Sequence, residues 1–259
     1  MRVLTSSSES KKIFALMYGE SGTGKTHFAA TLGELPHGHT LIIDVDQGSQ
    51  TVWNAKDLQK PQIDSNVIVV SFDRFRDLDD AYQLVKKNDP KEWNRVFSSA
   101  NVPGASFNIS EPFDWIVWDT WSELQFHMLQ ELRSRESDLK GTGRLDFRKN
   151  IGIQHWGMLT DLNKLAIEQL RSCSINQLFI MQETMTKDDL SGQITGGPAI
   201  HGKMVQEMPA YFDVVIHSTT NLQGVFIAST QRKGKWPAKT RLGEGKEYAN
   251  PRANQIFSV

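Results

Sequence analysis

Cysteine is nearly absent from this sequence, because the 259 residues include only Cys173. No disulfide can form within the chain, and such usage is typical of a reducing compartment, so we expect a cytoplasmic protein. Long hydrophobic runs are lacking as well. No apolar stretch reaches membrane length, and the residues from Met1 to Ser6 lack the apolar core of a secretion signal. We therefore expect no membrane partner.

An excess of charge of one sign is also missing. The chain carries 29 Lys and Arg against 30 Asp and Glu, for a formal net charge of −1. No global positive field attracts nucleic acid, so any such site must be local. Hydrophobic residues make up 39% of the chain, which is ordinary for a soluble protein able to bury one good core.

The most informative stretch lies near the N-terminus and fits the G-x-x-x-x-G-K-[ST] phosphate loop. An apolar run, residues 13–18, precedes it as a predicted buried strand, and residues 27–32 can continue it as a helix. Glycines let successive N–H groups turn toward a phosphate. We expect nucleotide contacts from the whole loop: Gly19, Glu20, Ser21, Gly22, Thr23, Gly24, Lys25 and Thr26.

Two side chains of this loop have defined chemistry. Lys25 supplies a positive charge to the β- and γ-phosphates, and the Thr26 hydroxyl is placed to hold Mg²⁺. ATP and Mg²⁺ are therefore the expected cofactors. The alternative, a glycine-rich turn that matches by accident, is disfavoured by the strand before the loop and the helix after it.

Acidic and amide side chains end three further predicted strands. Residues 40–46 end in Asp44 and Asp46, either of which could orient the attacking water or simply cap the strand. Residues 113–120 include Asp119, expected on the Mg²⁺ side of the site. Residues 177–182 end in Gln182, whose amide can contact the γ-phosphate and sense its loss.

Basic residues concentrate in three segments, which are the expected contacts for single-stranded DNA. The tail from Arg232 to Arg252 carries a surplus of bases and contains Trp236, although a solvated strand face explains the pattern equally well. The predicted DNA contacts are Arg144, Arg148, Lys149, Lys187, Arg232, Lys233, Lys239 and Arg241.

The order of these parts resembles the RecA-type recombinase core. It is most similar to the short phage single-strand annealing ATPases of the Sak type, over roughly residues 12–243. The resemblance rests on the phosphate loop, Ile42-Ile43-Asp44-Val45-Asp46, Trp118-Asp119-Thr120, Trp156-Gly157, and the run from Gly197 to Lys203 before Tyr211-Phe212-Asp213.

The resemblance implies further roles. Asp46 falls where the family has a glutamate that polarises the hydrolytic water, and its shorter side chain makes slow hydrolysis an expectation. Trp53 lies where recombinases stack an aromatic ring on adenine, although a core position is as plausible. Residues 137–149 and 183–196 correspond to the two DNA-binding loops. The implied partners are single-stranded DNA, a single-strand-binding protein and further copies of the chain in a ring or filament.

The predicted fold is α/β: a RecA-like P-loop core with a mostly parallel central sheet flanked by helices, and a C-terminal antiparallel hairpin extension. We expect a flexible leader at 1–11, the ATPase core at 12–221, and a hairpin with the basic tail at 222–259, packed on the same domain. Only about a dozen residues precede the first strand, which favours annealing over autonomous strand exchange.

The favoured activity is DNA-stimulated ATP hydrolysis in phage recombination, within the host cytoplasm. The alternatives are a P-loop ATPase of another process, such as packaging, helicase loading or signalling, and a nucleotide-gated DNA-binding module without effective hydrolysis.

Overall fold

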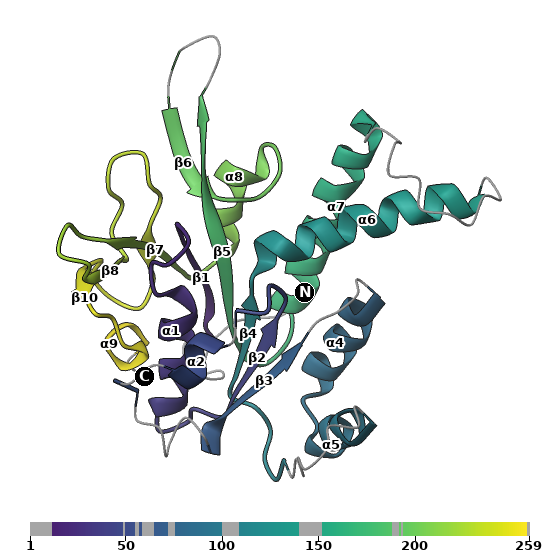
Figure 1. Cartoon of the computed structure of the whole chain (residues 1–259), viewed down its shortest axis with the longest axis horizontal. Coiled ribbons are helices and arrows are strands. Elements are labelled where there is room, and N and C mark those ends of the chain that lie inside the picture. The colour runs from purple at the N-terminus through teal and green to yellow at the C-terminus, as the bar shows by residue number, and fades with distance from the viewer. Residues whose placement is uncertain are drawn as a thin grey trace, which may run out of the picture.

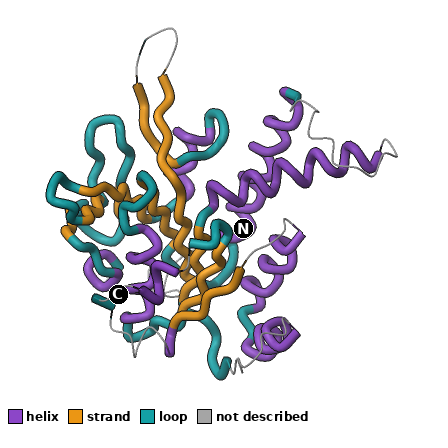
Figure 2. The backbone as a smooth tube through the Cα atoms, in the orientation of Figure 1, coloured by secondary structure: helices purple, strands orange, loops and turns teal. Residues whose placement is uncertain are grey.

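A computed structural model describes residues 12–48, 50–54, 57–58, 65–71, 76–99, 109–139, 152–187, 192 and 194–257. Their strands form one ten-stranded sheet, with helices packed on both of its faces (Figures 1 and 2). No helix within these ranges is both long and apolar enough to cross a membrane. The strands are β1 (Phe14–Gly19), β2 (Thr40–Asp44), β3 (Val67–Ser71), β4 (Trp115–Asp119), β5 (Asn176–Lys187), β6 (Ile194–Pro198), β7 (Val214–Thr220), β8 (Phe226–Ser229), β9 (Lys239–Thr240) and β10 (Glu247–Ala249).

The centre of the sheet is parallel, in the order β3-β2-β4-β5-β1-β7. Strand β8 then pairs antiparallel with β7, and β10 pairs antiparallel with β8. This arrangement confirms the predicted fold class, an α/β core with a mostly parallel central sheet flanked by helices and with antiparallel strands in the C-terminal part.

Helices cover both faces because the buried strands are apolar on both sides. In β1, Phe14, Leu16 and Tyr18 pack toward one core, whereas Ala15 and Met17 pack toward the other. The first core is completed by α4 (Arg76–Lys87), α5 (Pro90–Ser99), α6 (Trp121–Leu139), α7 (Ile153–Arg171) and α8 (Met204–Glu207). The second is completed by α1 (Lys25–Ala30), α2 (Gln50–Asn54) and α9 (Ala253–Ile256).

Strand β5 differs from the sequence-based expectation. Residues 183–196 were predicted to form a polar loop, but β5 continues to Lys187 and pairs antiparallel with β6, from Glu183 opposite Pro198 to Lys187 opposite Ile194. Residues 184–186, Thr-Met-Thr, include two β-branched residues that favour a strand, and the pairing satisfies their backbone groups. The result is a hairpin that projects from the body of the molecule (Figure 1).

The C-terminal strands also pair differently. Within residues 222–259, which were expected to contain a hairpin, β9 pairs with β7 rather than with β8, and Val214 faces Thr240. Strand β8 takes β10 as its second partner instead. Beyond β10, the chain returns to the core below α1, where Phe257 is buried at 2% exposure. There the Ala253 N–H donates to Thr31 Oγ1 at 2.9 Å.

Parallel pairing brings several strand ends to one edge of the sheet. Gly19 at the end of β1 lies opposite Gln182 in β5, and Asp44 at the end of β2 lies opposite Asp119 at the end of β4. In open parallel sheets, ligands bind at this carboxyl edge.

Candidate active site

The phosphate loop joins β1 to α1 and has the backbone conformation that its glycines allow. Gly22 has φ 76° and Gly24 has φ 81°, both in the left-handed region, and Gly24 directly precedes α1. The hydroxyl of Thr23 donates to the Glu20 carbonyl at 2.8 Å across the loop. The loop is therefore preformed, with its N–H groups at the N-terminus of a helix, where anions bind favourably.

Strands from the C-terminal part brace this loop. Ser218 of β7 donates its hydroxyl to the Thr23 carbonyl at 2.7 Å. A Cβ at Gly19 would overlap the Ser218 carbonyl, and a Cβ at Gly24 would meet the Phe226 ring at 2.9 Å. These two glycines are thus needed for close packing as well as for the shape of the loop.

Lys25 is buried, and its ammonium group is held by the loop itself. Nζ donates to the carbonyls of Gly19 at 2.8 Å and Glu20 at 2.6 Å. Gln182 Oε1 lies 3.5 Å from the same nitrogen. Burial lowers the pKa of Lys25 from its ordinary value, and neighbouring carboxylates, first Asp119, oppose that shift. A bound phosphate would supply the stronger acceptor at this position.

Thr26 and Asp119, which were predicted to lie on the Mg²⁺ side of the site, are in direct contact. The Thr26 hydroxyl donates to Asp119 Oδ2 at 2.7 Å, while the buried Asp119 Oδ1 has no hydrogen-bond partner. Burial raises the pKa of Asp119 to about 7; the hydrogen bond from Thr26 opposes this shift, whereas the charges of Asp46 and Asp44 add to it.

A buried carboxyl oxygen without a partner fits a site for Mg²⁺ or its bound water. Among the described residues, no group of three or more His, Cys, Asp or Glu side chains forms a metal cage. Mg²⁺ typically takes one or two protein oxygens and completes its shell with phosphate and water. Thr26 and Asp119 are the residues that would hold it here.

Asp46 lies beyond the strand that was predicted to contain it. Strand β2 ends at Asp44, and Asp46 follows in a turn where Gln47 has φ 60°. Both carboxylates accept the Gly48 N–H, Asp44 at 3.1 Å and Asp46 at 3.0 Å. Burial raises the pKa of Asp46, the Gly48 hydrogen bond lowers it, and the nearby Asp44 raises it further.

Gln182 connects the nucleotide cavity to the projecting hairpin. Its side chain lies beside Lys25, and its backbone N–H donates to Ser122 Oγ at 3.0 Å. The same strand continues without interruption to Lys187. A change at the phosphate therefore has a direct covalent route to the β5–β6 hairpin.

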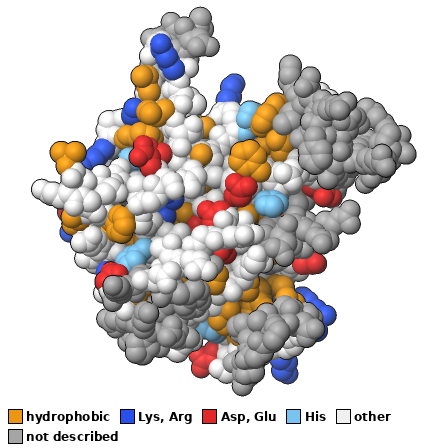
Figure 3. Space-filling model, in the orientation of Figure 1, with side chains coloured by type: hydrophobic (Ala, Val, Ile, Leu, Met, Phe, Trp, Pro, Cys, Tyr) orange, Lys and Arg blue, Asp and Glu red, His pale blue; other side chains and the backbone are white. Residues whose placement is uncertain are grey.

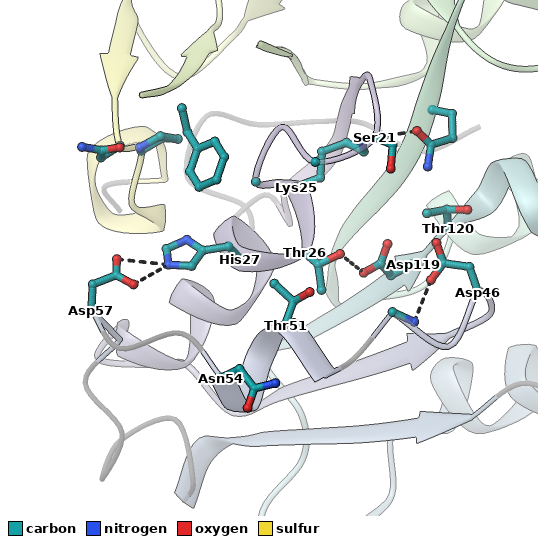
Figure 4. Close-up of a pocket in the computed structure, with 17 residues that line it drawn as sticks. Ser21, Lys25, Thr26, His27, Asp46, Thr51, Asn54, Asp57, Asp119 and Thr120 are labelled. Carbon is teal, nitrogen blue, oxygen red and sulfur yellow. Dashed lines mark hydrogen bonds and ion pairs between the residues drawn. The ribbon is translucent and has the colours of Figure 1, made fainter. Parts of the chain in front are cut away.

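The loop and the acids border a cavity of about 680 Å³. Figure 4 shows Asp46, Asp119 and Thr120 on one side of Lys25 and Thr26, with His27 and Asp57 on the other. His27 Nε2 lies 3.0 Å from an Asp57 carboxyl oxygen. The volume is typical of a small-molecule site.

Sequence reasoning missed part of this lining. Phe226, Asn250 and Pro251 border the cavity, although they lie in the segment 222–259, which was expected to form a hairpin and a basic tail. The Asn250 N–H donates to the Phe226 carbonyl at 2.7 Å, which ties the two walls together. These residues are about two hundred positions from the phosphate loop, so no local sequence pattern indicates that they line the same cavity.

The predicted DNA contacts are not gathered at this cavity. Arg144, Arg148 and Lys149 lie outside the described residues, as does the side chain of Trp53. Lys187 is exposed at the end of β5, and Arg232 is exposed and donates to the Gly234 carbonyl at 3.2 Å.

The other basic-tail residues have partners or partial cover. Lys233 pairs with Glu247, and Arg241 pairs with Asp213 at 2.8 Å. Partial burial lowers the pKa of Lys239. The tail therefore offers less free positive charge than its composition indicates.

Comparison with known proteins gives a family match over most of the chain and distant similarity to solved structures. The family described as "AAA domain" matches residues 11–242 of the chain. A crystal structure of the RadB recombinase aligns with a TM-score of 0.47 and 13% sequence identity, covering 92% of this chain and 86% of that one. No curated protein sequence matches the chain.

Proposed function

The chain belongs to the AAA-domain family, and from that premise we propose that it binds and hydrolyses ATP and couples this cycle to single-stranded DNA in annealing or recombination. The observation that carries the proposal is the position of Gln182. It lies 3.5 Å from the Lys25 ammonium and begins the part of β5 that leaves the body of the molecule. One residue thus joins the phosphate end of the cavity, through its side chain, to the hairpin, through the strand that contains it.

In this proposal each residue of the cavity has one task. Lys25 and the loop N–H groups bind the β- and γ-phosphates, and Thr26 with Asp119 holds Mg²⁺. Mg²⁺, when bound, neutralises phosphate charge during transfer. Asp46 accepts a hydrogen bond from the attacking water and polarises it as a general base. Gln182 contacts the γ-phosphate and loses that contact after hydrolysis.

The opposite end of the cavity would receive the nucleobase. Phe226 presents an aromatic ring there, and Asn250 offers an amide that can hydrogen-bond to the base edge. Because the Phe226 ring also packs on Gly24, base binding and the shape of the phosphate loop would support each other.

The DNA would lie on the side of the projecting hairpin, which carries Lys187 at the end of β5. Arg144, Arg148 and Lys149, which follow α6 in sequence, would add phosphate contacts. Further copies of the chain in a ring or filament, and a single-strand-binding protein, are the proposed partners.

A second candidate is a nucleotide-gated DNA-binding module without effective hydrolysis. It is favoured by the hydrogen bond from Gly48, which occupies the same Asp46 carboxylate that would orient the water. Asp46 is also one methylene shorter than the glutamate of the resembled family.

ATP turnover measured with and without single-stranded DNA separates these two candidates from a third, an ATPase of another process. DNA-stimulated turnover that is lost in Lys25→Ala, but kept in the exposed control Lys91→Ala, supports the proposal. Turnover that DNA does not change favours an ATPase of another process. Tight ATP binding with no turnover supports the gated module, and absence of ATP binding refutes all three.

A further inference from the structure

A second cavity lies against the acidic end of the nucleotide cavity. It has a volume of about 380 Å³, and Asp46, Thr120 and Gln182 line both cavities. Its outer walls come from α6, from the start of α7 and from residues 199–201. Figure 3 shows hydrophobic side chains beside a histidine on this face, above acidic side chains near its centre.

Three aromatic side chains border this second cavity. Phe126 of α6 is 58% exposed, which is high for a large apolar residue. Trp156 of α7 stacks on His201, with ring centroids 4.0 Å apart and planes 24° from parallel. Burial lowers the pKa of His201, so at neutral pH the stacked Trp156–His201 pair carries no charge.

The aromatic wall is tied to the phosphate sensor by hydrogen bonds. The Gln125 side chain donates to the Ala199 carbonyl at 3.0 Å and accepts a hydrogen bond from the backbone N–H of His201 at 3.1 Å. Ser122 also donates to the Ala199 carbonyl, at 2.9 Å, and accepts the Gln182 N–H at 3.0 Å. The Ala199 N–H in turn donates to the Gln182 carbonyl at 2.7 Å. Displacement of Gln182 would therefore move His201 with it.

The electrostatics of the cavity determine which part of a ligand can enter. Asp46 and Glu123 make its inner side acidic, so a phosphate is repelled there. A flat, neutral aromatic group is not repelled, and it gains stacking contact with Phe126 and the Trp156–His201 pair. The size suits one such group with its sugar rather than a longer segment.

We propose that this second cavity binds one unstacked nucleobase of single-stranded DNA, against Phe126 and the Trp156–His201 pair. This inference rests on the proposed binding of single-stranded DNA, and it adds a base-binding site bordered by Gln182, the residue proposed to contact the γ-phosphate. Duplex DNA is excluded, because its bases are paired and stacked and extracting one costs free energy. Base stacking on aromatic rings is tolerant of sequence, so we expect little base preference.

Coupling follows from the shared wall. Gln182 borders both cavities, and its backbone bonds to Ser122 and Ala199, so a nucleotide that shifts this residue would also shift the aromatic wall. By linkage, base binding must then change nucleotide affinity by the same factor as nucleotide changes base affinity.

An oligonucleotide carrying 2-aminopurine tests the site, because stacking quenches the fluorescence of this base. Phe126→Ala should weaken its binding about 5- to 150-fold, the range for loss of one stacked base, and should reduce the quenching. The salt dependence should stay unchanged, because no phosphate contact is lost. Trp156→Ala should act likewise, and Trp156→Phe should recover part of the effect.

The control is Leu165→Ala, which removes another exposed apolar side chain of α7 away from this cavity. It should bind like the unmodified protein, and thermal melts of all variants establish that they fold. An abasic oligonucleotide should bind the unmodified protein and Phe126→Ala equally.

Two failures are distinguishable. If the unmodified protein binds single strands but Phe126→Ala matches it in affinity and quenching, this site is refuted and the proposed function stands. If the unmodified protein does not bind single strands at all, the proposed function fails and this site fails with it.

Discussion

The buried carboxyl group of Asp119 makes stability depend on pH in a way that Asp119→Asn should remove. Without nucleotide, the pKa of Asp119 is raised to about 7 from an ordinary value of 3.8, mainly by burial. Between these values the folded protein keeps a proton that the unfolded chain releases. The resulting stabilisation is fully present below pH 3.8 and is lost as the pH rises through about 7.

The size of the effect follows from the two pKa values. Each unit of pKa difference corresponds to about 1.4 kcal/mol. Raising the pH from 5 to 8 should therefore lower the free energy of unfolding by about 3 kcal/mol through Asp119 alone. Asparagine resembles the protonated acid in shape and does not titrate, so Asp119→Asn should match the parent near pH 5 and exceed it at pH 8.

Urea unfolding of the nucleotide-free protein, followed by tryptophan fluorescence at pH 5, 6, 7 and 8, measures this difference directly. Asp161→Asn, which alters an exposed carboxylate on α7, is the matched control and should follow the parent at every pH. Saturating Mg²⁺ and ATP should reduce the pH dependence, because a cation favours the ionised carboxylate. If the free energy of unfolding changed with pH in the same way for the parent and for Asp119→Asn, the Asp119 carboxyl group would not be the cause of the pH dependence.

Three further predictions concern the nucleotide cavity. Lys25→Ala should abolish ATP binding in isothermal titration without unfolding the free protein, as a thermal melt would check, and retained affinity would contradict its role. Phe226→Ala should weaken ATP binding about tenfold, a loss typical of one stacked base, whereas an unchanged affinity would place the base elsewhere. Asp46→Asn should bind ATP without hydrolysing it and Asp46→Glu should hydrolyse faster than the parent; normal turnover in Asp46→Asn would point to Asp44 as the base.

The parts of the site that were predictable are those encoded by local pattern. Lys25 and Thr26 follow glycines that only a phosphate loop requires in that order, Asp119 ends an apolar strand, and Gln182 follows the apolar part of another. Parallel pairing then brings such strand ends together whatever the rest of the chain does. The fold class could be predicted for the same reason, since it follows from the succession of apolar strands and helices.

Long-range contacts could not be predicted in this way. Phe226 packs on Gly24 across about two hundred residues, and Arg241 of the basic tail pairs with Asp213, which lies outside that tail. Composition alone therefore overestimated the free charge of the tail. The extension of β5 was missed because its stability depends on β6, which sequence patterns near Gly196 and Gly197 present as a turn.

The C-terminal segment returns to the core, so the part of the chain that folding requires extends beyond the part that matches the family. The Phe257 ring lies 5.9 Å from that of Phe28 and 4.9 Å from that of Trp115, and Arg252 pairs with Glu34 at 2.6 Å. A fragment cut at residue 242, where the family similarity ends, would lose all of these contacts. Loss of one buried phenylalanine side chain alone costs about 3–5 kcal/mol, against a total stability of about 5–15 kcal/mol for a typical domain. If the chain were shortened from the C-terminus, a loss of nucleotide binding would therefore reflect unfolding rather than removal of a binding residue.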